Sequence, residues 1–365
     1  MRPWSEPDYK PAFPKGYRPG IGVVGCGKIV RSSHLRSYAA YGQRVVGVYD
    51  VRAEATAGIR EEHGVETVFG SLAELLAHPE IEVVDVATHP EVRPALIREA
   101  LAAGKHVLAQ KPLAVDLAAA HELVEEAERL GLTLAVNQNG RWAPAWRVAT
   151  LLVERGAIGD IFAVTHLYDH NYDFTLGTVF DGIEHLVLYD YSVHWFDITR
   201  CWLEGKTVTT VRAREYRTPN QPPESAAPWG AWATIEYEDG SNAFIRGIGG
   251  ATTRRPTKPF WIHGSEGTIR GHVLGSGDRP GPELVELERN GARTRFELDG
   301  TWNSQGFAGT MGELISAIAE GREPYNSARH NLLSLELTLA ACRSAEEDGQ
   351  PVPIAVGETA HEVSR

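Results

Sequence analysis

The segment ATHPEVRPALIREALAAGKHVLAQKPL, residues 87–113, indicates the architecture of the first half of the chain. The apolar run before it, EVVDVA at residues 82–87, favours a short strand. Residues 91–103 carry apolar side chains at helical spacing, a glycine follows, and residues 106–109 form a second apolar run. This order predicts a parallel βαβ unit, in which Lys111 leaves the carboxyl end of a strand, where open parallel sheets bind ligands. The alternative for Lys111 is a solvated lysine at a strand end.

Length and composition limit the class of protein. At 365 residues the chain is long enough for two domains, and 42% hydrophobic with 23% charged residues is the composition of an ordinary globular protein. A net charge of -12 argues against nucleic acid and anionic membrane surfaces as partners, because such binders carry basic patches. The first residues contain no apolar signal region and no later run reaches a membrane-spanning length, which predicts a cytoplasmic protein.

The cysteines indicate neither a disulfide framework nor a zinc ribbon. Cys26, Cys201 and Cys342 are in no CxxC spacing, and we expect all three to be reduced and buried.

Residues 20–30, GIGVVGCGKIV, read as a strand that enters a glycine turn and then a helix. Gly25 and Gly27 would let backbone amides approach a pyrophosphate, although Val30 stands at the third position of the GxGxxG fingerprint. A second strand at residues 44–50 ends in Asp50, at the spacing where a carboxylate binds the adenosine ribose. Asp50 favours NAD, while the nearby Arg52 could accommodate NADP; the alternative is an aspartate that caps the next helix.

Strands and helices continue to alternate up to residue 136, which predicts a doubly wound parallel sheet, a Rossmann domain, over residues 20–137. Long alternating runs then follow, with Asp-Gly and Asn-Gly turns, and predict an α/β domain with a large, mainly antiparallel open sheet over residues 138–350. We assign substrate binding and oligomerisation to this domain and a tail to residues 351–365. Residues 1–19 alternate prolines and aromatics, as in a disordered arm or an arm that packs across a neighbouring subunit.

A helix expected at residues 184–203 carries Asp190, His194 and Asp197 at i, i+4 and i+7 on an otherwise apolar surface. A carboxylate one turn from an imidazole can fix its tautomer, as a general base requires. The alternative is a histidine that is hydrogen-bonded in a core. A metal site from His185, Asp190 and His194 lacks a clear further ligand, so no metal is expected.

These motifs occur in a characteristic order. With GCGKI, the strand-end Asp50, the turn after the fourth strand, AGKHVLAQKPL, AVNQNGRWAPA and DYSVHWFD, the chain resembles the glucose-fructose oxidoreductase / inositol dehydrogenase / MocA family over nearly its whole length after the arm. The resemblance implies a Rossmann domain, a C-terminal α/β domain whose open sheet is buried in a homodimer or homotetramer, a nicotinamide cofactor, and sugar or polyol substrates.

The resemblance also implies roles for individual residues. Lys111, Asp190 and His194 match the catalytic trio of the family. Together with Arg52, the cofactor contacts that we expect are Gly25, Gly27, Lys28, Ile29, Asp50, Thr88, His89, Gln110, Lys111 and Asn137. Besides the trio, the expected substrate contacts are Arg141, Trp142, Tyr168, His170 and Tyr172, for which an ordinary core or surface position is the alternative. Three residues depart from the family: Gln110 replaces glutamate, Arg93 stands where histidine is frequent, and Val30 replaces a small residue.

The hypothesis that follows is an NAD(P)-dependent dehydrogenase acting on a sugar or polyol hydroxyl. His194 would accept the hydroxyl proton, Asp190 would stabilise the imidazolium, and Lys111 would polarise the oxygen. One alternative is a glycoside-cleaving enzyme that retains NAD and oxidises its substrate only transiently. Another is a non-catalytic NAD(P) sensor, against which the intact trio argues.

Overall fold

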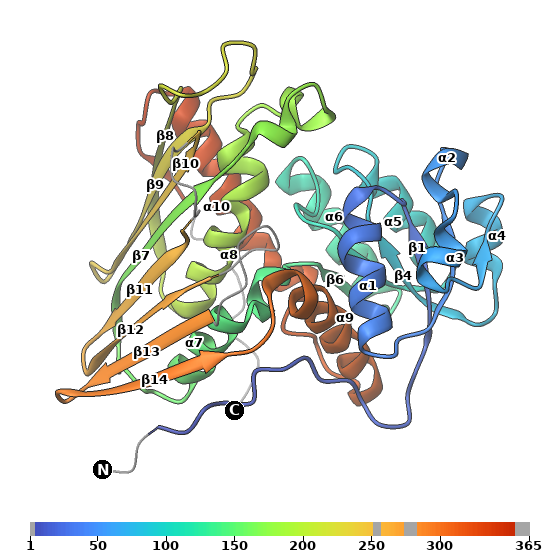
Figure 1. Cartoon of the computed structure of the whole chain (residues 1–365), viewed down its shortest axis with the longest axis horizontal. Coiled ribbons are helices and arrows are strands. Elements are labelled where there is room, and N and C mark those ends of the chain that lie inside the picture. The colour runs from blue at the N-terminus through green and yellow to red at the C-terminus, as the bar shows by residue number, and fades with distance from the viewer. Residues whose placement is uncertain (1–3, 251–256, 274–282, 355–365) are drawn as a thin grey trace.

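The computed structural model describes residues 4–250, 257–273 and 283–354. Its first layer is a six-stranded sheet in which every neighbouring pair is parallel, in the order β3-β2-β1-β4-β5-β6, as in dinucleotide-binding domains (Figure 1). Its strands are β1 (Gly20–Val24), β2 (Val45–Tyr49), β3 (Thr67–Val68), β4 (Ile81–Val86), β5 (His106–Ala109) and β6 (Leu134–Val136). The predicted Rossmann domain is therefore confirmed.

Helices cover both faces of this sheet, as right-handed βαβ connections require. They are η1 (Val30–His34), α1 (Leu35–Ala40), α2 (Ala53–Thr56), α3 (Ile59–His63), α4 (Leu72–Ala77), α5 (Arg93–Ala102) and α6 (Leu117–Arg129). The first of these, η1, is a π-helical turn, which replaces the regular α-helical start expected after the glycine turn. Val30 begins this turn and is fully buried.

The second layer is a nine-stranded sheet in the order β14-β13-β12-β11-β7-β10-β9-β8-β15, antiparallel except for the β7–β10 pair. Its strands are β7 (Ile161–His170), β8 (Val208–Tyr216), β9 (Gly230–Tyr237), β10 (Asn242–Gly249), β11 (Pro259–Gly264), β12 (Gly267–His272), β13 (Glu283–Arg289), β14 (Ala292–Leu298) and β15 (Val352–Pro353). At the predicted β13–β14 turn, Asn290 and Gly291 have φ angles of 52° and 72°, as a type I′ turn requires.

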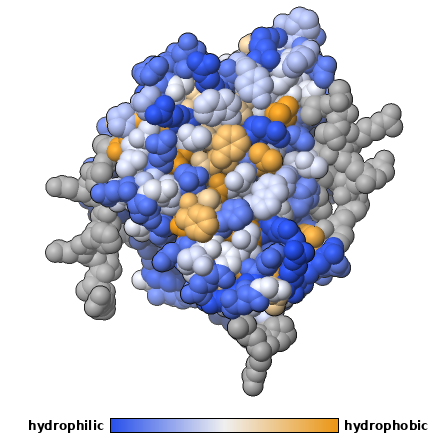
Figure 2. Space-filling view, turned by 90° about the vertical axis from the view of Figure 1, so that its left-hand side faces the viewer, coloured by the Kyte–Doolittle hydropathy of each residue, from blue (hydrophilic) through white to orange (hydrophobic). Residues whose placement is uncertain are grey.

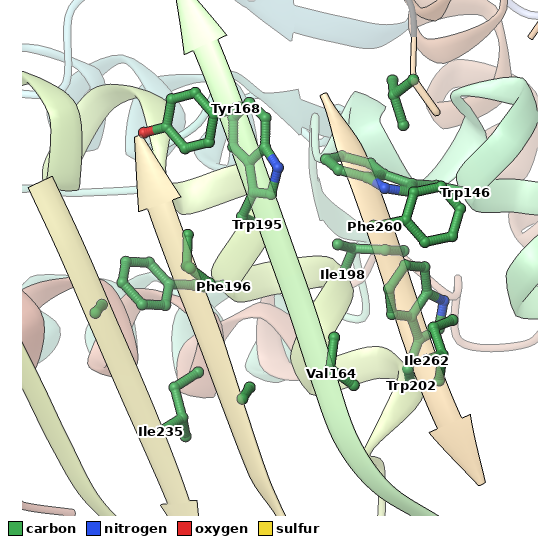
Figure 3. Packing of buried hydrophobic residues seen from close by; sticks show 14 of the residues in the cluster. Trp146, Val164, Tyr168, Trp195, Phe196, Ile198, Trp202, Ile235, Phe260 and Ile262 are labelled. Carbon is green, nitrogen blue, oxygen red and sulfur yellow. The ribbon is translucent and has the colours of Figure 1, made fainter. Parts of the chain in front are cut away.

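Within the described part of the chain, helices pack on one face of the nine-stranded sheet and leave the other uncovered (Figure 1). The remaining helices of the chain are η2 (Asn139–Trp142), α7 (Pro144–Glu154), η3 (Asp173–Thr175), η4 (Val179–Gly182), η5 (Leu186–Tyr191), α8 (Val193–Trp202), α9 (Trp302–Glu320) and α10 (Ala328–Glu346). Large aromatic side chains of α7 and α8 fill the space against β7 and β11 (Figure 3). Trp146 meets Trp195 edge to face at 5.5 Å, and Tyr168 stacks on Trp195 at 4.0 Å. This aromatic core fixes α8, and with it His194, against the sheet.

The outer face of the sheet carries apolar side chains among polar ones (Figure 2). Phe162 is 53% exposed, and Trp232, Phe244 and Trp261 are half-buried at positions that alternate with core residues. The open sheet predicted from the sequence is therefore confirmed.

The last two long helices connect the layers. Met311, Leu314 and Ile315 of α9 are fully buried in one cluster with Val23 and Leu108 of the parallel sheet, so α9 covers the first layer although it follows the second in sequence (Figure 1). Along α10, Leu332 and Leu335 enter the Rossmann core, whereas Leu337, Ala340, Ala341 and Cys342 enter the core of the second layer.

The arm, over its described residues 4–19, packs on its own chain instead of being disordered. Tyr9 is 4% exposed, and its hydroxyl accepts the backbone N–H of Asp299 at 2.9 Å. Phe13 packs against Tyr41 with ring centroids 5.9 Å apart, and the Tyr17 hydroxyl donates to Glu82 at 3.1 Å. The arm therefore contacts both layers, as its course along the lower edge of Figure 1 shows.

The single helix expected over residues 184–203 is two helices. η5 is π-helical, with the backbone N–H of Ser192 donating to the carbonyl of Val187 five residues earlier at 2.8 Å, and α8 begins at Val193. The Tyr168 hydroxyl holds this wide turn through Ser192 Oγ at 2.8 Å and the Val187 carbonyl at 3.3 Å. Because the turn is widened, Asp190 does not continue the line of His194 and Asp197.

Within the described residues, no helix is long and apolar enough to cross a membrane, and no group of three or more His, Cys, Asp and Glu side chains is arranged to hold a metal ion. All three cysteines are free and buried.

Candidate active site

The glycine turn after β1 leaves room beside a helix start. Gly25 has a φ of 92°, and a Cβ there would lie 2.9 Å from the carbonyl oxygen of Ala87, so only glycine fits. A Cβ at Gly27 would meet no atom within 4 Å, which leaves open space over the turn. Lys28 and Ile29 next to it are exposed. This geometry allows a pyrophosphate to approach the backbone amides.

Asp50 at the end of β2 is bound to the same turn. Its carboxylate accepts the backbone N–H groups of Cys26 at 2.7 Å and of Arg52 at 2.9 Å, and its side chain is 8% exposed. The Arg52 guanidinium is 61% exposed and lies 3.6 Å from Asp50. The acid is thus fixed beside the glycines, where the sequence argument expected it.

The turn after β4 contributes Thr88 and His89. Thr88 Oγ1 is buried without a hydrogen-bond partner in the described structure, whereas His89 is exposed with its ring 6.4 Å from that of Phe180. Arg93 is 1% exposed and donates to the carbonyls of Thr88 and Pro112. Burial lowers the pKa of Arg93 to about 10. Arg93 therefore connects the turn after β4 to the turn after β5, where its partner Pro112 follows Lys111 directly.

Lys111 points across to η5. Its Nζ donates to the Asp190 backbone carbonyl at 2.7 Å and to the Asp190 carboxylate at 3.0 Å, and the two side chains are 13% and 17% exposed. The Lys111 side chain is thus largely buried but keeps some exposed surface. Asp190 is paired with Lys111, and within the described residues no hydrogen bond joins it to His194.

His194 is the second residue of α8 and lies near the Lys111–Asp190 pair. Burial lowers the pKa of the imidazole well below its usual range, the positive charge of Lys111 lowers it further, and Asp197 partly opposes both. Its Nδ1 is buried and has no partner among the described residues, and its ring meets Trp302 of α9 edge-on at 5.1 Å. A neutral imidazole next to an ammonium group is able to accept a proton.

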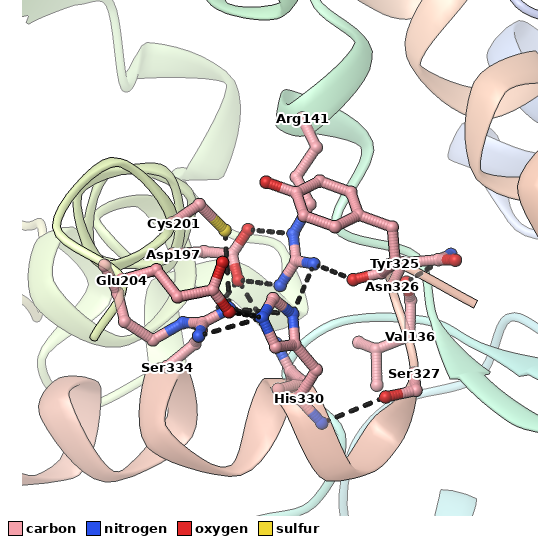
Figure 4. Close-up of polar contacts among 12 residues, drawn as sticks. Val136, Arg141, Asp197, Cys201, Glu204, Tyr325, Asn326, Ser327, His330 and Ser334 are labelled. Carbon is pink, nitrogen blue, oxygen red and sulfur yellow. Dashed lines mark hydrogen bonds and ion pairs between the residues drawn. The ribbon is translucent and has the colours of Figure 1, made fainter. Parts of the chain in front are cut away.

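Arg141 does not join this cluster (Figure 4). Its side chain is fully buried, and its guanidinium pairs with both carboxylate oxygens of Asp197 at 2.6 and 2.7 Å and with His330 at 3.0 Å. Ser334 of α10 also donates to Asp197, at 2.7 Å. Arg141 therefore joins η2 to α8 and α10.

The aromatic residues expected at the substrate divide into two groups. Trp142 is 5% exposed, and Tyr168 and Tyr172 are fully buried, so all three belong to the core. His170 is partly buried at the end of β7, and its ring centroid lies 5.0 Å from that of Tyr191, which follows Asp190 in the chain. Of these four residues, His170 is the partly exposed one near the Lys111–Asp190 pair.

Sequence reasoning missed Gln138 and Trp302. Asn137, which it did include, is fully buried, with Nδ2 unpartnered and Oδ1 accepting from Thr310 at 2.8 Å. The Gln138 amide is 1% exposed, and neither its nitrogen nor its oxygen has a partner in the described structure. The position of Gln138 directly after β6 was a usable signal, because polar side chains at the carboxyl ends of parallel strands line ligand sites. Trp302 follows β14, and nothing local in the sequence connects it to α8.

The comparisons with known proteins agree with this geometry. Residues 20–138 match the family model described as "Oxidoreductase family, NAD-binding Rossmann fold", and residues 151–354 match "Oxidoreductase family, C-terminal alpha/beta domain". The chain belongs to this family of NAD-binding oxidoreductases, the glucose-fructose oxidoreductase / inositol dehydrogenase / MocA family, and the resemblance inferred from the motifs is confirmed.

Similar proteins include a D-apiose dehydrogenase of Paraburkholderia graminis, 28% identical over 89% of this chain and 87% of the relative. A 1,5-anhydro-D-fructose reductase of Ensifer adhaerens is 26% identical over 92% of this chain and 98% of the relative. The crystal structure of an oxidoreductase domain protein from Kribbella flavida shares the fold, with a TM-score of 0.78, 21% identity, and coverage of 92% of this chain and 99% of that one.

Proposed function

We propose that this oxidoreductase transfers a hydride between a carbinol carbon of a sugar or polyol and NAD, with His194 and Lys111 as the groups that handle the hydroxyl. The observation that supports this most strongly is the fixed position of Lys111, whose Nζ donates to the carbonyl and the carboxylate of Asp190. Burial, followed by the charge of Lys111, lowers the pKa of His194, so its imidazole is in the neutral form, which is the form that can accept a proton.

Each side chain then has one task. His194 accepts the proton of the substrate hydroxyl, and Lys111 donates a hydrogen bond to the same oxygen and stabilises negative charge there. Asp190 orients the lysine, because its carboxylate and carbonyl both accept from Nζ. This differs from the sequence hypothesis, in which Asp190 stabilised the imidazolium. Asp197, whose charge raises the pKa of His194, takes that electrostatic role.

The described residues fit a nicotinamide dinucleotide. The glycine turn has open space above it, Asp50 is fixed beside the turn, and Thr88 Oγ1 and Asn137 Nδ2 are buried polar atoms without partners. When bound, the nicotinamide supplies the hydride acceptor. Asp50 favours NAD over NADP, since a carboxylate repels a 2′-phosphate.

A sugar or polyol substrate is supported by the full-length relatives that are named for apiose and anhydrofructose. His170 and Tyr191, which are partly buried, place aromatic faces near Asp190, which suits a ring with apolar C–H and polar O–H edges. We further propose a homodimer or homotetramer through the outer face of the nine-stranded sheet, and a cytoplasmic location, which accords with three free cysteines.

The decisive experiment is NADH formation with NAD and a panel of aldoses, inositols, anhydrosugars and glycosides. His194→Ala and Lys111→Ala should each lower kcat by about two orders of magnitude or more and leave NAD binding, measured by calorimetry, nearly unchanged. His121→Ala on the exposed face of α6 and Lys206→Ala at an exposed ion pair are matched controls. Near-normal kcat in either site variant would refute the assignment. Glycoside cleavage without net NADH would replace dehydrogenation by the cofactor-retaining reaction.

A further inference from the structure

A chain of buried polar contacts leads from Asp85 to the backbone N–H of Lys111. Asp85 of β4 is fully buried, and its Oδ2 lies 2.6 Å from the Tyr38 hydroxyl and 2.7 Å from Nδ1 of His34. Nε2 of His34 lies 3.4 Å from the amide nitrogen of Gln110. The amide oxygen of Gln110 accepts the backbone N–H of Lys111 at 2.8 Å.

The direction of every hydrogen bond in this chain is determined from its Lys111 end. A backbone N–H only donates, so the Gln110 group facing it must be the oxygen, and the Gln110 nitrogen must face His34. That nitrogen also only donates, so Nε2 of His34 must carry a lone pair and no proton. The single ring proton is then on Nδ1, where it donates to Asp85.

We infer that Gln110 holds His34 as the neutral Nδ1–H tautomer, and that His34 and Gln110 are positioning residues for Lys111. The chain fixes the backbone of Lys111 through a neutral amide, while its ammonium group is bound by Asp190. The effect of this positioning on turnover rests on the proposed function of Lys111. The tautomer of His34 does not rest on that function.

The surroundings of the ring agree with a neutral imidazole that is held rigidly. It faces Asp85 from β4 and Tyr38 from α1, and Phe307 of α9 covers it at 4.4 Å between ring centroids. Burial, followed by the charge of Asp85, raises the pKa of Tyr38 well above its usual range, so this hydroxyl remains a donor to Asp85. Asp85 faces Nδ1 of the ring, and Gln110 faces Nε2. The residue at position 110 therefore determines whether Nε2 carries a proton.

A glutamate at position 110 would reverse this choice. A carboxylate only accepts, so the backbone N–H of Lys111 and Nε2 of His34 would both have to donate to it. His34 would then carry a proton on both ring nitrogens, between Asp85 and the new carboxylate.

The test uses the whole protein labelled with ¹⁵N-histidine, with the His34 signals identified by their loss in His34→Gln. In the wild type, the ring nitrogens should show the neutral Nδ1–H tautomer at neutral pH. In Gln110→Glu they should show the imidazolium at neutral pH. Gln350→Glu, which adds the same charge at an exposed site after α10, should leave His34 neutral. The pH profile of kcat should gain the His34 ionisation in Gln110→Glu only.

An imidazolium or an Nε2–H tautomer in the wild type would overturn the inference, and this spectrum decides the matter even if Gln110→Glu does not fold. An unchanged pH profile in a Gln110→Glu enzyme whose His34 is protonated would overturn the positioning of Lys111. A neutral Nδ1–H ring in a protein without dehydrogenase activity would refute the proposed function alone.

Discussion

Arg141→Met should lower the free energy of unfolding strongly without changing the proton-transfer groups Lys111 and His194. Arg141 is fully buried and Asp197 is 2% exposed, and two hydrogen bonds of 2.6 and 2.7 Å join them. Removing one partner of a buried pair leaves an uncompensated charge, at a cost of about 3 to 5 kcal/mol. Ser334 continues to donate to Asp197, so we expect the lower end of this range, about 3 kcal/mol in the free energy of unfolding.

The assay is unfolding of the variants in urea and on heating. For a domain of this size the loss corresponds to a decrease in Tm of roughly 6 to 12 °C. The double variant Arg141→Met/Asp197→Leu should regain much of the loss, because no buried charge remains unpaired. Arg212→Met, at an exposed pair with Glu236, is the control and should change stability by less than about 0.5 kcal/mol.

A loss below about 1 kcal/mol in Arg141→Met would show that the buried-pair reasoning is wrong. A greatly raised KM for the sugar with full stability would instead return Arg141 to the substrate site, where the sequence had placed it.

Two further predictions concern the pH dependence of stability and the glycine turn. Hydrogen bonding to Glu215 raises the pKa of His185 from 6.5 to about 9, so this pair stabilises the fold fully below about pH 6.5, and the contribution is lost as the pH rises through about 9. In the wild type the urea midpoint of unfolding should therefore decrease between about pH 6.5 and about 9, and in His185→Asn this decrease should be smaller. The same decrease in both proteins would show that the His185–Glu215 pair does not cause it. Gly25→Ala should abolish NAD binding in calorimetry, because the added Cβ meets the Ala87 carbonyl at 2.9 Å; wild-type affinity would contradict the close approach.

The Rossmann half could be predicted from the sequence because its determinants are local. A buried parallel strand such as β2 is an almost continuous apolar run, and the glycine of the turn after β1 and the acid after β2 occupy fixed offsets from their strands. The hairpins of the second sheet were equally readable, since Asn290 and Gly291 must both adopt positive φ.

Helical spacing alone misplaced one member of the proposed catalytic cluster. The periodic argument put Asp190, His194 and Asp197 on one line, but the π-helical turn of η5 adds a residue and changes the phase between Asp190 and His194. The device that holds this turn, the Tyr168 hydroxyl, comes from β7. A contact from a distant strand leaves no mark on the local pattern, so the pairing of Asp190 with Lys111 could not be predicted.

The same limit explains why the supporting residues were missed. Trp302 against His194 and Phe307 against His34 both come from α9, which follows the second sheet in sequence and packs on the first layer. One helix thus contacts both the imidazole that we propose as proton acceptor and the imidazole that we infer to position Lys111. Because Trp302 and Phe307 are both buried in α9, a displacement of this helix would reach both rings. The two histidines are therefore expected to respond together to substitutions in α9, which no reading of their separate motifs would indicate.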